Sequence, residues 1–185
     1  MQDIKGDVVS RAGQGDLKAL EMIFKAYGDL VFNVSLRIVN NREDAEEVSQ
    51  DVLWIIARKI RSFEGRSSLK TWIYRITINA ALRYARRNTG KGRFVEYDDT
   101  INGGSGGNDV ERAADKEQAE AVVQGLLGEL SEEQRACIVL RSMEGLSYEG
   151  IADVLGIRVN AVRSRLKRAR EKLLSRRKEV MRDEM

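Results

Sequence analysis

The apolar residues of the chain recur every three or four positions, which is the pattern of amphipathic α-helices. In residues 1–90 this pattern predicts a helix after Asp16, a second that begins at an Asn41 cap, and a third over 69–87. The stripes of the first two helices are formed by Leu17, Leu20, Phe24, Tyr27, Val31 and Val34, and by Ala45, Val48, Val52, Ile55, Ile56 and Ile60. We therefore expect a compact helical domain over residues 1–90.

The periodicity disappears between residues 88 and 108. Residues 102–108 are rich in Gly, Ser and Asn, a composition typical of flexible linkers. Structureless loops of this length are uncommon inside compact domains. We therefore predict a flexible linker over 91–112 and a second domain over 113–185, while a long surface loop within a single domain remains the alternative.

Four further helices are predicted after the linker. The first covers 110–127, and Ser131 with Gln134 forms the capping-box pattern that opens a second, ending near Gly145. Ser147 opens a short helix ending at Gly156, and Asn160 suits the N-cap of a long last helix. Strand-like alternation is absent from the sequence, so the expected fold is all-α, with two small helical domains.

Residues 147–169 have the spacing of a helix-turn-helix. Ala152 allows two helices to cross closely, Gly156 permits the tight turn, and Val162 points back into the core of the pair. The residues left facing outward on the second helix, suited to contacts in the major groove of DNA, are Asn160, Arg163, Ser164, Lys167 and Arg168. The alternative is a plain helical hairpin with a solvated basic face.

The charges are segregated along the chain. Residues 158–178 hold ten Lys or Arg against the single acid Glu171, while residues 43–51 hold five acids and no base. A basic and an acidic block on one chain suggest two partners of opposite sign. The basic block favours DNA binding over the plain hairpin.

Several function classes are disfavoured by composition. The chain has no histidine and a single cysteine, Cys137, inside an apolar run where a buried role is favoured over a reactive thiol. A nucleophile–base set, a phosphate-binding glycine loop and a metal-ligand cluster are all missing from the sequence. We therefore expect no enzyme activity, cofactor or metal, and, without a secretion signal or a long apolar run, a soluble cytoplasmic protein.

Two blocks of sequence together resemble the extracytoplasmic-function group of bacterial RNA polymerase sigma factors, in the sigma-70 family. The first block comprises Asn41-Arg-Glu-Asp-Ala-Glu-Glu-Val, then Phe63-Glu-Gly-Arg-Ser-Ser-Leu-Lys-Thr-Trp, and Asn79. The second comprises Leu130-Ser-Glu-Glu-Gln-Arg135, Leu146-Ser-Tyr-Glu-Gly-Ile-Ala152 and Val162-Arg-Ser-Arg-Leu-Lys-Arg. The resemblance covers nearly the whole chain except the first dozen residues and the linker.

This resemblance implies a transcription initiation factor whose partners are core RNA polymerase, promoter DNA and an anti-sigma factor, with no small-molecule substrate. The acidic helix would dock on the polymerase through Glu47, Gln50 and Asp51. The first domain would melt the minus-ten element and hold one flipped base in a pocket that Asn79 helps to line. The residues implied for the minus-ten element are Phe63, Arg66, Ser67, Ser68, Lys70, Arg75, Asn79 and Arg83.

The last helix would recognise the minus-thirty-five element through its outward face. Here the chain departs from the family pattern, because Arg158 stands where a proline is common and Asn160-Ala161 where a Gly-Thr pair is common. Trp72 shares a stripe with Leu69 and Ile73, so a core position and a DNA-stacking role both remain open. A stand-alone helix-turn-helix regulator is the competing hypothesis; it would bind duplex DNA without polymerase.

Overall fold

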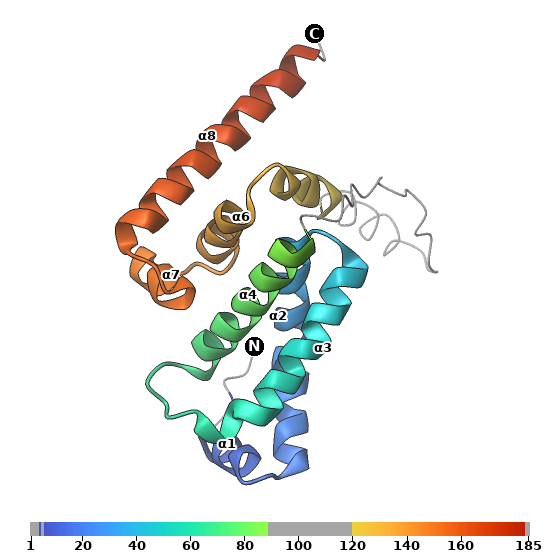
Figure 1. The fold of residues 1–185 in the computed structure, drawn as a ribbon, viewed down its shortest axis with the longest axis vertical. Coiled ribbons are helices and arrows are strands. Elements are labelled where there is room, and N and C mark those ends of the chain that lie inside the picture. The colour runs from blue at the N-terminus through green and yellow to red at the C-terminus, as the bar shows by residue number, and fades with distance from the viewer. Residues whose placement is uncertain (1–3, 5, 89–119, 184–185) are drawn as a thin grey trace, which may run out of the picture.

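The computed structural model describes residues 4, 6–88 and 120–183, with side chains up to residue 176. Within these ranges every regular element is a helix, which confirms the all-α prediction (Figure 1). The linker expected over 91–112, and residues 110–119 of the helix predicted over 110–127, lie outside the described residues.

The N-terminal bundle is built from helices whose starts are fixed by side-chain caps. The Asp16 carboxylate accepts hydrogen bonds from the backbone N–H groups of Lys18 and Ala19, and the Asn41 amide oxygen accepts one from Asp44. These caps confirm the helix starts predicted from the sequence. The elements are α1 (Gly6–Gly13), α2 (Leu17–Val39), α3 (Arg42–Lys59) with a following 3-10 turn (η1, Ile60–Ser62), and α4 (Leu69–Asn88).

The helix α1 was missed by the sequence analysis. It has only eight residues, and its buried face is limited to Val8 and Ala12, too short a stripe to reveal a period. It packs tightly on η1, because a Cβ atom at Gly13 would lie 3.3 Å from the Cα of Arg61. A small residue at position 13 therefore lets α1 close one end of the bundle.

The C-terminal bundle begins with a helix over 120–128 and ends in the long helix α8. Instead of one predicted helix from Ser131 to Gly145, the chain forms α6 and then a π-helical turn. Because α8 starts one residue before Asn160, Asn160 does not cap it, and its amide oxygen accepts a hydrogen bond from the Arg163 guanidinium at 3.2 Å. The elements are α6 (Glu132–Ile138), the π-helical turn η2 (Val139–Met143), α7 (Tyr148–Leu155) and α8 (Val159–Asp183).

The two bundles share one continuous apolar core. Arg135 on α6 is buried where they meet, and its guanidinium donates to the carbonyl of Ile38 at 2.5 Å and to that of Leu127 at 2.8 Å. Both carbonyls belong to the last turns of helices, where acceptors lack intrahelical partners and the helix dipole favours a cation. Burial lowers the pKa of Arg135, but these carbonyls satisfy its donors.

Two features are absent from the described part of the chain. None of its helices is long and apolar enough to cross a lipid bilayer. Nor do its Cys, Asp and Glu side chains gather in groups of three or more that would hold a metal ion. Cys137 itself is buried, as expected, and burial raises the pKa of its thiol to about 11.

Candidate functional site

The helix-turn-helix between α7 and α8 has the predicted geometry. Gly156 adopts the left-handed conformation with φ +64°, and its N–H donates to the Ala152 carbonyl to close the turn. Val162, Leu166 and Ala169 are fully or almost fully buried. The inward direction predicted for Val162 is therefore confirmed, and the opposite face of α8 is left to solvent.

That exposed face of α8 carries all five residues predicted to contact the minus-thirty-five element. Asn160, Arg163, Ser164, Lys167 and Arg168 are each exposed. The hydroxyl of Ser164 donates to the Asn160 carbonyl at 3.0 Å, and Lys167 lies 3.8 Å from Glu171, one turn further on. These are exposed local contacts of small energetic worth, so a phosphate or a base edge can replace them.

The loop before α4 leads from Phe63 to Ser68. The rings of Phe63 and Trp72 pack at 5.4 Å between centroids, and Trp72 is half-buried against the core. The Ser68 hydroxyl accepts from the N–H of Thr71 at 3.1 Å, so it caps the first turn of α4. The structure thus favours the core position for Trp72 and gives Ser68 a structural contact.

A hollow of about 600 Å³ lies beside this loop. Phe63 and Ser67 from the loop line it on one side, and Ser10 and Gln14 from the α1 end of the chain line it on the other. Because α1 was not predicted from the sequence, the contribution of Ser10 and Gln14 to this hollow was not predicted either. Asn79, by contrast, is exposed on α4 more than two turns after the start of the helix, and it does not line this hollow.

The basic side chains implied for the minus-ten element are spread along the loop and α4, each with a neighbour. Lys70 lies over the Tyr74 ring at 5.5 Å, and Arg83 donates to the Asn79 carbonyl at 3.1 Å. The remaining two are ion-paired, Arg66 with Glu64 at 2.6 Å and Arg75 with Asp153 at 2.5 Å.

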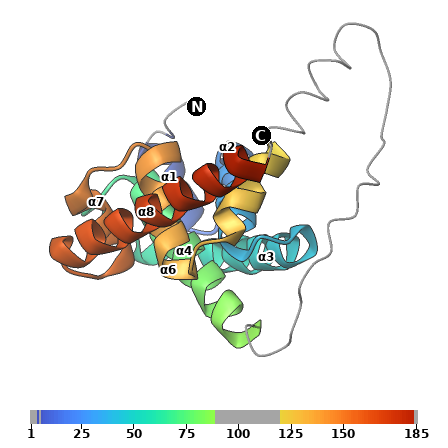
Figure 2. The same ribbon diagram turned by 90° about the horizontal axis from the view of Figure 1, so that it is seen from above.

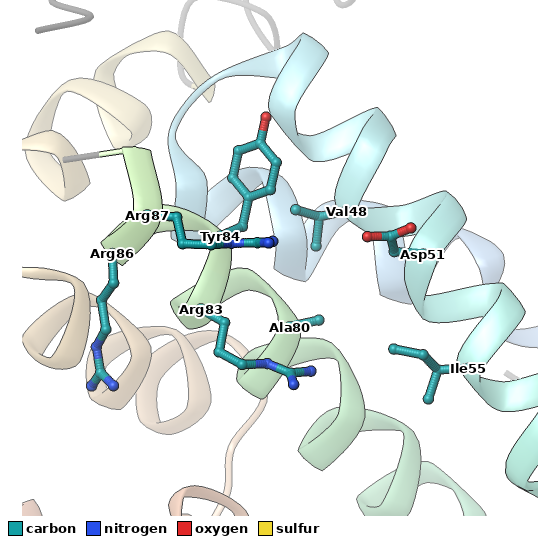
Figure 3. Close-up of a pocket in the computed structure, with 8 residues that line it drawn as sticks. All are labelled: Val48, Asp51, Ile55, Ala80, Arg83, Tyr84, Arg86 and Arg87. Carbon is teal, nitrogen blue, oxygen red and sulfur yellow. The ribbon is translucent and has the colours of Figure 1, made fainter. Parts of the chain in front are cut away.

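A pocket of about 290 Å³ lies between α3 and α4 (Figure 3). It is lined by residues for which the sequence analysis predicted two different partners. Asp51, predicted to bind polymerase, faces Arg83, predicted to contact DNA, and Arg87 across it. Val48 and Ile55 contribute to its apolar wall. The acidic face of α3 therefore adjoins the basic face of α4.

The exposed acidic face of α3 holds Glu47, Gln50 and Asp51, as predicted. Glu47 also has a structural contact, because the Tyr84 hydroxyl donates to it at 2.9 Å and to Asp44 at 2.8 Å. Burial, together with these two carboxylates, raises the pKa of Tyr84, so the hydroxyl stays protonated and keeps donating at neutral pH.

Trp54 is a residue of this face that the sequence analysis missed. Its side chain is 61% exposed, and the Arg58 guanidinium lies over its ring at 4.4 Å. The sequence held a signal, since Trp54 falls outside the apolar stripe of the helix and follows Gln50 and Asp51 by about one turn. A large exposed aromatic ring beside polar residues is typical of a protein interface.

The contacts between the two bundles were also missed. Arg75 pairs with Asp153, Arg86 with Glu133 at 2.9 Å, and the Tyr74 hydroxyl donates to the Glu144 carboxylate. These partners lie 47 to 78 residues apart in the sequence. Periodicity and spacing hold no signal at such separations.

Two family models match the chain, one in each bundle. The model described as sigma-70 region 2 matches residues 23–90, and the model described as sigma-70, region 4 matches residues 121–173. The first therefore spans most of α2 to α4, and the second covers α6, α7 and the first half of α8.

Curated relatives match over most of their length. The chain is 33% identical over 177 residues to the RNA polymerase sigma-H factor of Pseudomonas aeruginosa, covering 92% of each chain. It is 34% identical over 171 residues to the ECF RNA polymerase sigma-E factor of Haemophilus influenzae, covering 89% of this chain and 90% of the relative.

Solved structures are similar in fold. The structure of CnrH in complex with the cytosolic domain of CnrY aligns with a TM-score of 0.67 at 25% identity, over 94% of this chain and 96% of that one. The sigma factor RpoE of Bartonella quintana, crystallised with the anti-sigma factor NepR, aligns with a TM-score of 0.64 at 26% identity, over 85% and 96%. The chain belongs to the extracytoplasmic-function group of the sigma-70 family of RNA polymerase sigma factors.

Proposed function

We propose that this chain binds core RNA polymerase and directs it to promoters, acting in the cytoplasm as an initiation factor with no catalysis of its own. The observation that carries the proposal is the match of both sigma-70 regions in one chain, each presenting an exposed charged surface. The acidic surface on α3 suits a protein partner, and the basic surface on α8 suits DNA.

Polymerase docking is assigned to the face of α3 that holds Glu47, Gln50, Asp51 and Trp54. The acids supply charge complementarity and steering, while the exposed indole of Trp54 supplies apolar area to bury. Asp51 supports this assignment more strongly than Glu47, because Glu47 also accepts a hydrogen bond within the bundle.

Promoter contacts are assigned to two surfaces. On α8, Arg163, Ser164 and Lys167 face outward in the first two turns, where a recognition helix lies deepest in the major groove. On the N-terminal bundle, the loop from Phe63 and the exposed Asn79 of α4 would hold the melted minus-ten strand. Unstacking one base costs a few kcal/mol, which hydrogen bonds and phosphate contacts offset.

The family comparison also suggests regulation by a protein partner. Both solved relatives were determined with a second protein, and the one bound to RpoE is described as an anti-sigma factor. We infer that this chain is likewise held by an anti-sigma factor until a signal releases it.

A gel-shift series tests the proposed function against a stand-alone regulator. The chain is mixed with promoter duplex carrying both elements, with and without core polymerase. We expect a specific complex in the presence of core and only weak, salt-sensitive binding without it. Specific binding by the chain alone, unchanged by core, would instead favour a regulator.

A further inference from the structure

The pocket between α3 and α4 has an acidic wall on one side and a basic wall on the other. The carboxylate of Asp51 projects from α3, and the guanidinium groups of Arg83 and Arg87 project from α4 (Figure 3). Side chains with apolar surface line the space of about 290 Å³ between these charges. They are Val48 and Ile55 of α3, and Ala80 and Tyr84 of α4.

These opposite charges do not neutralise one another within the chain. Among the described residues, the Asp51 carboxylate and the Arg87 guanidinium have no ion-pair or hydrogen-bond partner. Arg83 donates through Nε to the Asn79 carbonyl, and its two terminal nitrogens have no partner in the same part of the chain. Arg86, the other base of the pocket, is instead paired with an acid of α6. Three charged groups of the pocket therefore remain for a binding partner.

Folding does not require these three charges. Asp51, Arg83 and Arg87 are exposed, and exposed charges contribute little to the stability of a helical bundle. The two helices are held together by buried apolar residues, such as Val52 of α3 and Ile78 of α4. The charges around the pocket are therefore better explained by binding than by folding.

A DNA phosphate fits this pocket poorly. A phosphate held by Arg83 and Arg87 would face the carboxylate of Asp51, and like charges brought together weaken binding. It would also lie against the apolar side chains of Val48 and Ile55, which offer it no hydrogen bond. Surfaces that bind DNA are, by contrast, polar and strongly basic. The mixed charge of the pocket therefore argues against a phosphate as its ligand.

A protein segment matches every wall of the pocket. An apolar side chain can be buried between Val48 and Ile55, as the anchor residues of protein interfaces are buried in pockets of the partner. A carboxylate beside it can bind the two guanidinium groups, and a Lys or Arg on its other side can bind Asp51. Side chains three or four residues apart on a helix are neighbours and can supply this arrangement. The pocket thus fits an apolar side chain that is flanked by an acid and a base.

The pocket is continuous with the polymerase-docking face proposed for α3. Asp51 belongs to both, and Trp54 follows it by about one turn of α3 with an exposed ring. Because residues three apart are neighbours on a helix surface, one partner can cover the indole and the pocket together. In both views α3 lies on the side of the N-terminal bundle away from α7, so the helix-turn-helix does not cover this face (Figures 1 and 2).

We propose that Arg83 and Arg87 belong to the polymerase-docking surface, and that the pocket between α3 and α4 receives an apolar side chain of core polymerase flanked by an acid and a base. This inference rests on the proposed function for the identity of the partner. It replaces the expectation, implied by the family resemblance, that Arg83 contacts the minus-ten element.

Charge reversal at Arg87 tests the docking role. Arg87→Glu should weaken binding to core polymerase by about tenfold or more, because a carboxylate of polymerase then faces a second carboxylate. Lys18→Glu is the matched control, since it makes the same charge change at an exposed position of α2 outside the pocket and should leave binding unchanged. Thermal melting should show both variants folded like the wild type. Equal affinities of the two variants for core polymerase would overturn the proposal.

Promoter binding separates a polymerase contact from a DNA contact. With core polymerase at saturating concentration, the Arg87→Ala holoenzyme should bind promoter duplex with the affinity and salt dependence of the wild-type holoenzyme. Loss of a phosphate contact would instead lower the affinity and reduce the salt slope by about one. That result, together with normal core binding, would overturn the proposal and assign Arg87 to DNA.

Cross-linking identifies the neighbour of the pocket without relying on a loss of affinity. Arg83→Cys is labelled with a benzophenone maleimide, while the natural Cys137 is buried, and the holoenzyme is irradiated with and without promoter DNA. We expect a covalent product with a polymerase subunit in both cases, and none from Lys18→Cys labelled in the same way. Cross-links to DNA, or none to polymerase, would overturn the proposal. A wild-type chain that does not bind core polymerase would contradict the proposed function itself, and this distinguishes the two failures.

Discussion

The guanidinium of Arg58 lies 4.4 Å from the centre of the Trp54 ring, and both side chains project from the outer face of α3. The contact holds an exposed indole in place at the edge of the acidic docking face. A pre-positioned aromatic side chain loses little conformational entropy when a partner covers it. This geometry makes Trp54 the strongest apolar anchor on the proposed polymerase-docking face.

Trp54→Ala should therefore weaken binding to core polymerase by about 2 kcal/mol, or roughly thirtyfold, because buried tryptophans dominate interfaces. Its effect on folding should be small, since the ring is exposed. Leu17→Ala, which truncates the 77% exposed Leu17 on α2, is the matched control and should change neither property. Titration with labelled core polymerase and thermal melting give the two readouts; core binding equal to that of the control would exclude Trp54 from the interface.

Substitutions of Asp51 and Glu47 should differ in their effect on stability, because Glu47 also accepts a hydrogen bond within the bundle. Asp51→Lys should weaken polymerase binding and leave stability unchanged. Glu47→Lys should weaken binding and also lower the free energy of unfolding by about 1 kcal/mol, because Tyr84 loses one acceptor. Urea unfolding of both variants checks this; an equal effect on stability would show that the Tyr84 contact contributes nothing.

Asn79→Ala should leave stability and core binding intact, since the side chain is exposed on α4. If Asn79 hydrogen-bonds the flipped minus-ten base, open-complex formation should fall by about tenfold. Permanganate footprinting of the melted region measures this. A template already unpaired at the minus-ten element should show the same loss of affinity, whereas unchanged binding to it would remove Asn79 from the base pocket.

Arg163→Ala should relax sequence preference at one position of the minus-thirty-five element and cost roughly 1–3 kcal/mol. Arg176, three turns further along α8, should contact phosphates, so Arg176→Ala should weaken all sequences alike and reduce the salt dependence of binding. Both holoenzymes are measured against one library of upstream elements. If both variant holoenzymes lose affinity equally for all upstream elements, with no change in the preferred sequence, then this face of α8 makes no direct base contacts.

The parts of the fold predicted from the sequence were those set by local chemistry. Asn41 and Ser131 cap helices because their side chains reach backbone N–H groups three residues away. Val162 and Leu166 turn inward because helical geometry repeats along one segment. Both effects act within a few residues, so spacing alone predicts them.

Other parts of the fold were missed because they depend on neighbours distant in the sequence. The π-helical turn after α6 interrupts a segment whose composition favours a continuous helix. The pairing of Arg75 with Asp153, and the burial of Arg135 beneath Ile38, arise only once the two bundles are packed. Taken separately, each of these charged residues resembles any other residue on a solvated helix face.

Run-off transcription with purified core polymerase on a promoter library tests the central claim most directly. We predict transcripts only when the chain is added, from templates sharing two sequence elements separated by a fixed spacer, with the upstream preference altered by Arg163→Ala and total output lowered by Trp54→Ala. Failure of the folded chain to support any promoter-dependent transcript with core polymerase would contradict the assignment of this chain as a functional sigma factor.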